Sequence, residues 1–166
     1  MRARVLLSIV LALAAHQAAR AQQASAFATP ARDSAAVFVA MSHFAVGRLG
    51  SECLAVVGRA ESPKAFADAW KDRNAPFVAA STKYLSRRVD EAGAQGGLQR
   101  REAAQAEIRQ VIQASGENLL RTLLQGRKED GCMNAVTLVE TGVLDINTKL
   151  PQYSEVESLL LWSQQP

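Results

Sequence analysis

The fold is decided by residues 33–58, DSAAVFVAMSHFAVGRLGSECLAVVG, in which apolar side chains recur every three or four positions. This spacing places them on one face of an α-helix. The face consists of Phe38, Met41, Ala45, Leu49, Cys53 and Val56. Asp33 or Ser34 can cap the start of the helix. The sequence therefore predicts a helix up to about Gly58, with Cys53 directed into the core.

The same stretch is apolar enough to raise the question of a membrane span. Arg48 and Glu52 lie within it, four residues apart, where they can form an ion pair on the helix surface. Charged side chains are rare inside membrane-spanning helices. We therefore expect no stable membrane span in the mature chain.

Three further helices are predicted between this stretch and Gly126. Ser62-Pro63 is a cap followed by proline at the first helical position, and Asn74-Ala75-Pro76 can start the next helix in the same way. The glycine-rich residues 93–97 are expected to form a loop. A long helix with an apolar stripe follows, in which Gly116 marks either a bend or a close helix contact.

The C-terminal part predicts two more helices. Residues 127–131 are expected to form a solvated turn before a helix that opens at Cys132, and Gly142 suits the left-handed position after its end. Residues 154–157 have the pattern of a capping box, made by Ser and Glu, for a short last helix. The apolar residues within 143–146 are expected to fold back on the core. The fold class is thus all-α, a single-domain bundle of five or six helices over residues 33–166.

Cys53 and Cys132 predict one disulfide bond in an oxidising compartment. A metal pair or a reactive thiol are the alternatives, but zinc needs two further nitrogen or sulfur ligands, which one histidine cannot complete. Closing a loop of this size stabilises a fold by roughly 4 kcal/mol in the chain-entropy model. The bond is expected to tie the N-terminal third of the chain to its C-terminal third.

The N-terminus has the layout of a secretory signal peptide. A basic start precedes the apolar residues 5–15, which are too few to span a bilayer, and Ala19-Arg20-Ala21 has the small-x-small pattern of a cleavage site. We expect residues 1–21 to be removed after Ala21, which predicts a periplasmic or secreted bacterial protein. Residues 22–32 have no apolar periodicity and are expected to be a flexible mature N-terminus.

Removal of this leader changes the charge balance. The full chain has 19 Lys and Arg against 16 Asp and Glu, and three of the arginines lie in the leader. The mature chain would therefore have equal numbers of basic and acidic side chains, which excludes a global field for nucleic acid or anionic lipid. Residues 93–97 lack the Lys-Ser/Thr pair of a phosphate-binding loop, and no haem-attachment motif occurs. No cofactor is expected.

Few side chains suit catalysis. His43, the one histidine of the mature chain, is expected to be an ordinary histidine at a helix edge, which disfavours nucleophilic catalysis with a histidine base. Glu52, beside Cys53, is either a functional acid or the ion-pair partner of Arg48. Asp145 is either functional or a loop cap. These observations favour a non-catalytic protein.

Candidate interaction residues lie around the glycine loop and at the C-terminus. The basic cluster consists of Arg87, Arg88, Arg100 and Arg101, diluted by neighbouring acids. Aromatic side chains carry much of the energy of protein interfaces. Trp162 is expected to be partly exposed, whereas Trp70, Tyr84 and Tyr153 fit the core.

The leading hypothesis is an exported, non-catalytic binding or accessory protein that acts through protein contact, such as an inhibitor, an immunity protein or an envelope accessory module. Its partner would be another envelope or secreted protein. A helical carrier of an apolar ligand is the second hypothesis, because helix bundles can open a cavity between helices. A hydrolase or lyase that acts on cell-wall glycan through an acid such as Glu52 is the third.

Overall fold

The computed structural model describes residues 27–165 and is all-helical over that range. Five helices follow one another along the chain: α2 (Pro30–Cys53), α3 (Pro63–Arg73), α4 (Ala75–Leu123), α5 (Lys128–Glu140) and α6 (Tyr153–Ser163). The predicted fold class is confirmed. The expected signal peptide and its cleavage site after Ala21 lie outside the described residues. Within them, no helix combines the length and the apolar character that crossing a membrane requires.

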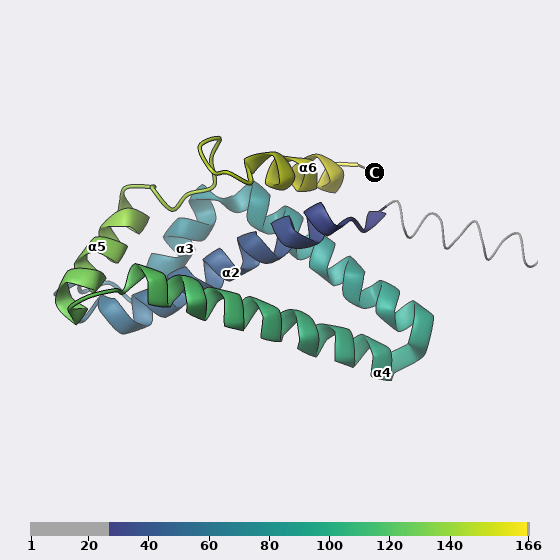
Figure 1. The fold of residues 1–166 in the computed structure, drawn as a ribbon, viewed down its shortest axis with the longest axis horizontal. Coiled ribbons are helices and arrows are strands. Elements are labelled where there is room, and N and C mark those ends of the chain that lie inside the picture. Colours follow the sequence, from purple (N-terminus) through teal and green to yellow (C-terminus); the bar gives the residue numbers. More distant parts are fainter. Residues whose placement is uncertain (1–26, 166) are drawn as a thin grey trace, which may run out of the picture.

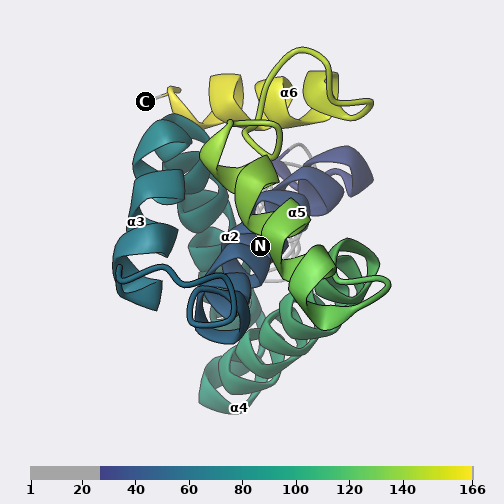
Figure 2. The same ribbon diagram turned by 90° about the vertical axis from the view of Figure 1, so that its left-hand side faces the viewer.

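Helix α2 is the centre of the bundle and packs against each of the other four helices (Figures 1 and 2). The predicted apolar face explains this position, since Ala45, Leu49 and Cys53 are buried. Helix α6 crosses α2 and α4, and α5 covers the other end of α2. The core therefore forms around the stretch whose periodicity was the strongest in the sequence.

Helix α4 consists of two arms joined by a kink (Figure 1). Gly96 and Gly97 have non-helical backbone angles there, and Gly97 has a φ of 69°, which side chains other than glycine disfavour. We call residues 75–95 the first arm and residues 98–123 the second arm. The expected loop over residues 93–97 is therefore wrong for residues 93–95, which are helical, and only the break at Gly96 and Gly97 is present; the arms form a long helical hairpin.

The start of α2 differs from the prediction. We expected residues 22–32 to be flexible, but the helix begins at Pro30, and the Thr29 side chain caps it by accepting a hydrogen bond from the Arg32 backbone N–H (3.2 Å). Phe27 is buried as well. Thr29-Pro30 is the same combination of cap and proline as Ser62-Pro63, so this part of the prediction was wrong for residues 27–32.

The start of α3 agrees with the prediction, since the Ser62 hydroxyl accepts a hydrogen bond from the Ala65 backbone N–H (3.1 Å). Helix α5 begins at Lys128, so the expected turn over residues 127–131 is wrong. Glu129 and Asp130 lie in the first turn of α5, where negative charge is favourable near the positive end of the helix dipole. The residues that looked like a solvated turn are therefore good helix-starting residues.

The start of α6 also differs from the prediction. The helix begins at Tyr153, one residue before the expected capping box, and the N-cap residue Gln152 makes no side-chain cap hydrogen bond. The end of α5 agrees with the prediction, because Gly142 has a φ of 74° just after the helix. In the following loop Ile146 is buried, as expected.

The predicted disulfide bond between Cys53 and Cys132 is present, and both residues are fully buried. It joins the last residue of α2 to α5, with a Cα–Cα distance of 5.1 Å and a sequence separation of 79. The bond thus holds α5 against the central helix and encloses α3 and α4 in one covalent loop.

Gly116 lies where the second arm crosses α2 closely. A Cβ atom at this position would lie 2.4 Å from Cδ1 of Phe44 and 3.2 Å from the carbonyl oxygen of Met41. Of the two readings from the sequence, a bend or a close helix contact, the contact is therefore correct.

Replacing Gly116 by valine is expected to lower the free energy of unfolding by about 2 kcal/mol, because the added atoms overpack this crossing. Urea unfolding followed by circular dichroism measures the change. Gly47→Ala on α2 is the matched control: a Cβ there meets nothing within 4 Å, and removal of a helical glycine should stabilise the protein by about 0.5–1 kcal/mol. A similar loss in both variants would contradict the assignment.

Candidate functional site

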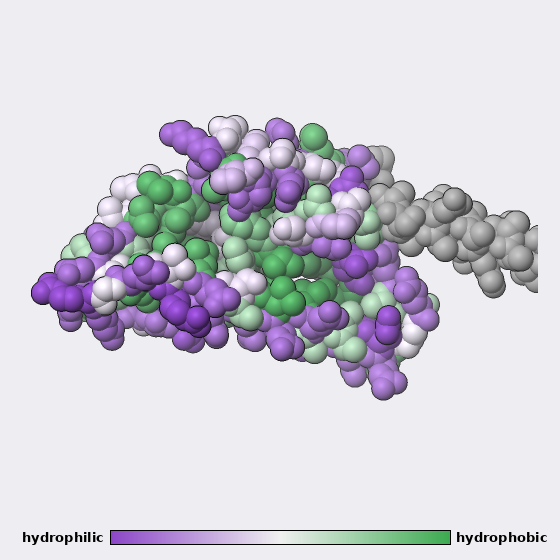
Figure 3. Space-filling model, viewed as in Figure 1, coloured by the Kyte–Doolittle hydropathy of each residue, from purple (hydrophilic) through white to green (hydrophobic). Residues whose placement is uncertain are grey.

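A groove lies between α2 and the two arms of α4, and we call it the arm groove. Its volume is about 420 Å³. Its apolar lining comes from all three segments and includes Val37, Leu85, Ala92, Ala103, Ala104, Ile108 and Val111. Figure 3 shows apolar residues around the hollow in this part of the molecule. The groove exists because the arms diverge from the kink, while the small alanine side chains on their inner faces leave space.

One wall of the arm groove carries charges that neutralise one another. Arg88 on the first arm lies 3.3 Å from the Asp33 carboxylate of α2 and 3.8 Å from Glu91, both measured from guanidinium nitrogen to carboxylate oxygen. The Tyr84 hydroxyl donates a hydrogen bond to Asp33 (2.9 Å). Burial and the adjacent Asp33 carboxylate raise the pKa of Tyr84 to about 12, so its hydroxyl stays a donor at neutral pH. These contacts fix the first arm to α2.

The other wall, on the second arm, carries two charges that have no ion-pair partner in the part of the chain that the structure describes. Arg100 and Glu107 both line the arm groove, and neither forms an ion pair with any residue in the range 27–165. They are seven residues apart, so they lie on nearly the same face of the helix. Ala103 and Ala104 lie between them. The groove-facing side of the second arm therefore carries a cation, two small apolar side chains and an anion in succession along the helix.

The predicted basic cluster does not form a positive patch. Arg101 pairs with Asp90 (3.1 Å), and Arg87 lies 3.8 Å from Glu91 while its guanidinium covers the Phe27 ring. With Arg88 held by Asp33, only Arg100 of the four arginines keeps a charge unpaired among the described residues. An anionic polymer would thus meet a largely neutralised surface.

Trp162 is not the partly exposed anchor that we expected. It is 7% exposed and packs against Phe27 (5.0 Å between ring centroids) and Tyr84 (5.3 Å), with Lys83 over its ring. These aromatic rings hold the start of α2, the first arm and α6 together. Trp162 therefore belongs to the core.

The acids singled out in the sequence have structural partners. Glu52 accepts a hydrogen bond from the Arg48 guanidinium (2.7 Å) on the surface of α2, which agrees with the simpler of its two readings. Asp145 pairs with Arg73 (2.8 Å) and accepts a hydrogen bond from the side chain of Asn74 (3.2 Å). Asp145 thus connects the loop after α5 to the end of α3, whereas Glu52 makes an ion pair within α2.

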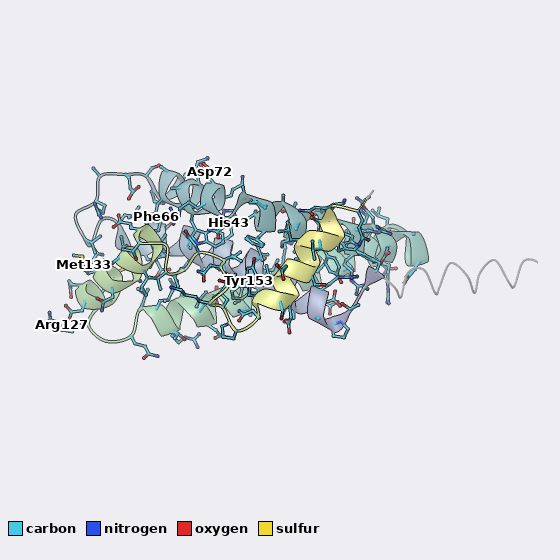
Figure 4. The ribbon with its side chains drawn as sticks, turned by 90° about the horizontal axis from the view of Figure 1, so that it is seen from above. His43, Phe66, Asp72, Arg127, Met133 and Tyr153 are labelled. Carbon is cyan, nitrogen blue, oxygen red and sulfur yellow. A yellow bond between two sulfur atoms is a disulfide. The ribbon has the colours of Figure 1, made fainter. Side chains whose placement is uncertain are left out.

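His43 is labelled in Figure 4 and lies on α2, where its ring stacks on that of Trp70 at 6.0 Å between centroids. Burial, and secondarily the charge of Lys71, lowers its pKa. The ring is thus held neutral against an indole at neutral pH. Within residues 27–165, no group of three or more His, Cys, Asp or Glu side chains could hold a metal ion.

The arm groove is the site that the sequence did not predict. Its lining on the second arm follows the helical spacing of residues 100, 103, 104, 107, 108 and 111, of which only residues 108 and 111 belong to the apolar stripe predicted for this helix. Comparison of the chain with models of protein families, with curated proteins and with solved structures gives no match. The groove itself is therefore the basis for a functional proposal.

Proposed function

We propose that this chain is an exported, non-catalytic binding or accessory protein, and that the arm groove is where it contacts another polypeptide. The observation that carries the proposal is the open groove with apolar lining and unpaired charges on one wall. The leader pattern of residues 1–21 and the buried disulfide bond support export to an oxidising compartment.

The shape of the groove favours a helix as the occupant. Two helical arms and α2 bound it, and an amphipathic helix placed between diverging helices completes a bundle by burying its apolar face. Its walls carry both signs of charge, as is usual at the polar rim of a protein interface. Arg100 and Glu107 would then select a helix with complementary charges.

A carrier of an apolar ligand is the second candidate. A volume of about 420 Å³ falls in the range of small-molecule sites, and the lining is aliphatic. The charged second-arm wall argues against this candidate, since an alkyl chain would leave Arg100 and Glu107 unpaired. The third hypothesis, an acid-dependent hydrolase or lyase, has no support at Glu52, because the Glu52 carboxylate forms an ion pair with Arg48.

Incorporation of a photo-crosslinking amino acid in place of Ala104 tests the proposal in the cells that naturally produce the protein. Ala104 lines the arm groove, so we expect irradiation to produce a covalent adduct with a polypeptide, identified by mass spectrometry. Ala106 is the matched control, because it is exposed on the same arm and does not line the arm groove. A lipid-sized adduct at residue 104 would favour the carrier, and no adduct at all would overturn both proposals.

A further inference from the structure

On the groove wall of the second arm, the two charges that have no ion-pair partner within residues 27–165 are arranged so that the arm complements itself. Arg100 and Glu107 have opposite charges, and the midpoint between them along the helix lies between Ala103 and Ala104. When two such arms lie antiparallel with these midpoints opposite each other, Arg100 of each copy faces Glu107 of the other. The same register places Ala103 opposite Ala104. A two-fold axis requires this reciprocity at an interface between identical chains.

From this register we infer that the polypeptide in the arm groove is a second copy of this chain, with the second arms antiparallel across the mouths of the two grooves. The inference rests on the proposed function, whose site it uses. In this dimer Arg100 of each copy contacts Glu107 of the other, on either side of Ala103 and Ala104.

The helix geometry of the second arm fits this contact. Seven residues span about 10 Å along a helix axis and return to almost the same face, so both charges point the same way. Small side chains at the crossing let the two axes approach to the short end of the usual range of about 8–10 Å. Ala103 and Ala104 provide this close approach at the centre, and the charged side chains reach across on either side.

Apolar surface next to the charges would be covered by the same contact. Val111 lines the arm groove and is 43% exposed, and Ile108 beside it is partly exposed. Exposed aliphatic side chains beside paired charges are typical of the transition from core to rim in an interface. The acids of the opposite wall do not compete for Arg100, because Arg88 already holds Asp33 and Glu91.

A helix of another protein in this position would need an acid opposite Arg100 and a base opposite Glu107, two helical turns apart. The second arm of another copy carries an acid and a base at this spacing. A second copy is also present wherever the protein itself is produced, without a further partner. Charge complementarity therefore favours the second copy over a partner of other sequence.

Charge reversal with mixing tests the inference on the purified, disulfide-bonded protein by sedimentation velocity at low salt. We expect a concentration-dependent dimer for the natural sequence. Arg100→Glu alone places two acids against each other at both contacts, and Glu107→Arg alone places two bases there. Each should raise the dimer dissociation constant by about tenfold or more, because two repulsive contacts replace two attractive ones in each dimer.

The decisive sample is the equimolar mixture of the two single variants. In a mixed dimer both contacts become opposite in sign, so the mixture should dimerise although neither variant does so well alone. The double variant R100E/E107R should also recover the dimer. Glu102→Arg is the matched control: Glu102 is exposed on the same arm outside the groove and has no ion pair among the described residues, so its reversal should leave the constant within about twofold.

A natural sequence that stays monomeric at high concentration, or a mixture that behaves as the average of its components, would overturn the inference. The crosslinker at residue 104 then separates this failure from that of the proposed function. An adduct of two copies supports both proposals. An adduct with a different polypeptide leaves the proposed function standing and excludes the second copy as occupant.

Discussion

Replacing both Cys53 and Cys132 by alanine is expected to lower the free energy of unfolding by about 4 kcal/mol. The bond closes a loop with a sequence separation of 79, and its loss gives the unfolded chain the conformational freedom of that loop. Helix α5 packs mainly against α2 and also contacts α4, and loss of the bond removes its covalent attachment to the centre of the bundle. Urea unfolding followed by circular dichroism measures the change. Replacing both cysteines avoids leaving a reactive thiol in the core.

Reduction provides the control for this experiment. A reducing agent should shift the unfolding midpoint of the natural sequence towards that of the alanine variant and leave the variant unchanged. Hydrogen exchange should also become faster in α5 than in the first arm, because the first arm keeps its contacts with α2 and α6. A loss of less than about 1 kcal/mol would show that packing alone holds α5 in place.

Replacing Asn74 by alanine is expected to lower the free energy of unfolding by about 3 kcal/mol, because it leaves buried polar groups without partners. Asn74 is 1% exposed and accepts a hydrogen bond from the Ile146 backbone N–H (2.7 Å). Its amide also donates to the carbonyl oxygen of Trp70 (2.8 Å) and to Asp145 (3.2 Å). One side chain thus fixes the loop after α5 to the junction of α3 and α4.

Urea unfolding of Asn74→Ala beside Asn134→Ala measures this contribution. Asn134 is exposed on α5 and makes no side-chain hydrogen bond among the described residues, so its replacement should change the stability by less than about 0.5 kcal/mol. Asn74→Asp should also destabilise, because the carboxylate cannot donate to Trp70 and lies against Asp145. Equal stability of the natural sequence and Asn74→Ala would contradict the role of this network.

Asn74 also shows why helix boundaries were harder to predict than helices. In the sequence it resembles an N-cap before Pro76, but in the structure its side chain makes no cap hydrogen bond and binds Ile146 instead. Ser62 is capable of the same local contact and does cap its helix, because within residues 27–165 no group distant in sequence competes for its hydroxyl. Local patterns predict a cap correctly only where the tertiary structure leaves the side chain available.

The burial of Cys53 and Leu49 could be predicted because their periodicity on one helix defines the core face. The arm groove could not, because it depends on three segments that meet only after the kink at Gly96 and Gly97 has formed. The arginines illustrate the same limit. Arg88 and Arg100 looked equivalent beside the glycines, but a carboxylate from α2, distant in sequence, neutralises only the first.

The covalent loop closed by Cys53 and Cys132 includes the kink between the arms. A protease that cuts the backbone at Gly97 would therefore release no fragment. The two resulting polypeptides would remain one molecule, joined through sulfur and by the packing of both arms on α2. Such a nicked protein would migrate as a single species until it is reduced, so damage at the tip of the hairpin would not by itself remove the protein from its compartment.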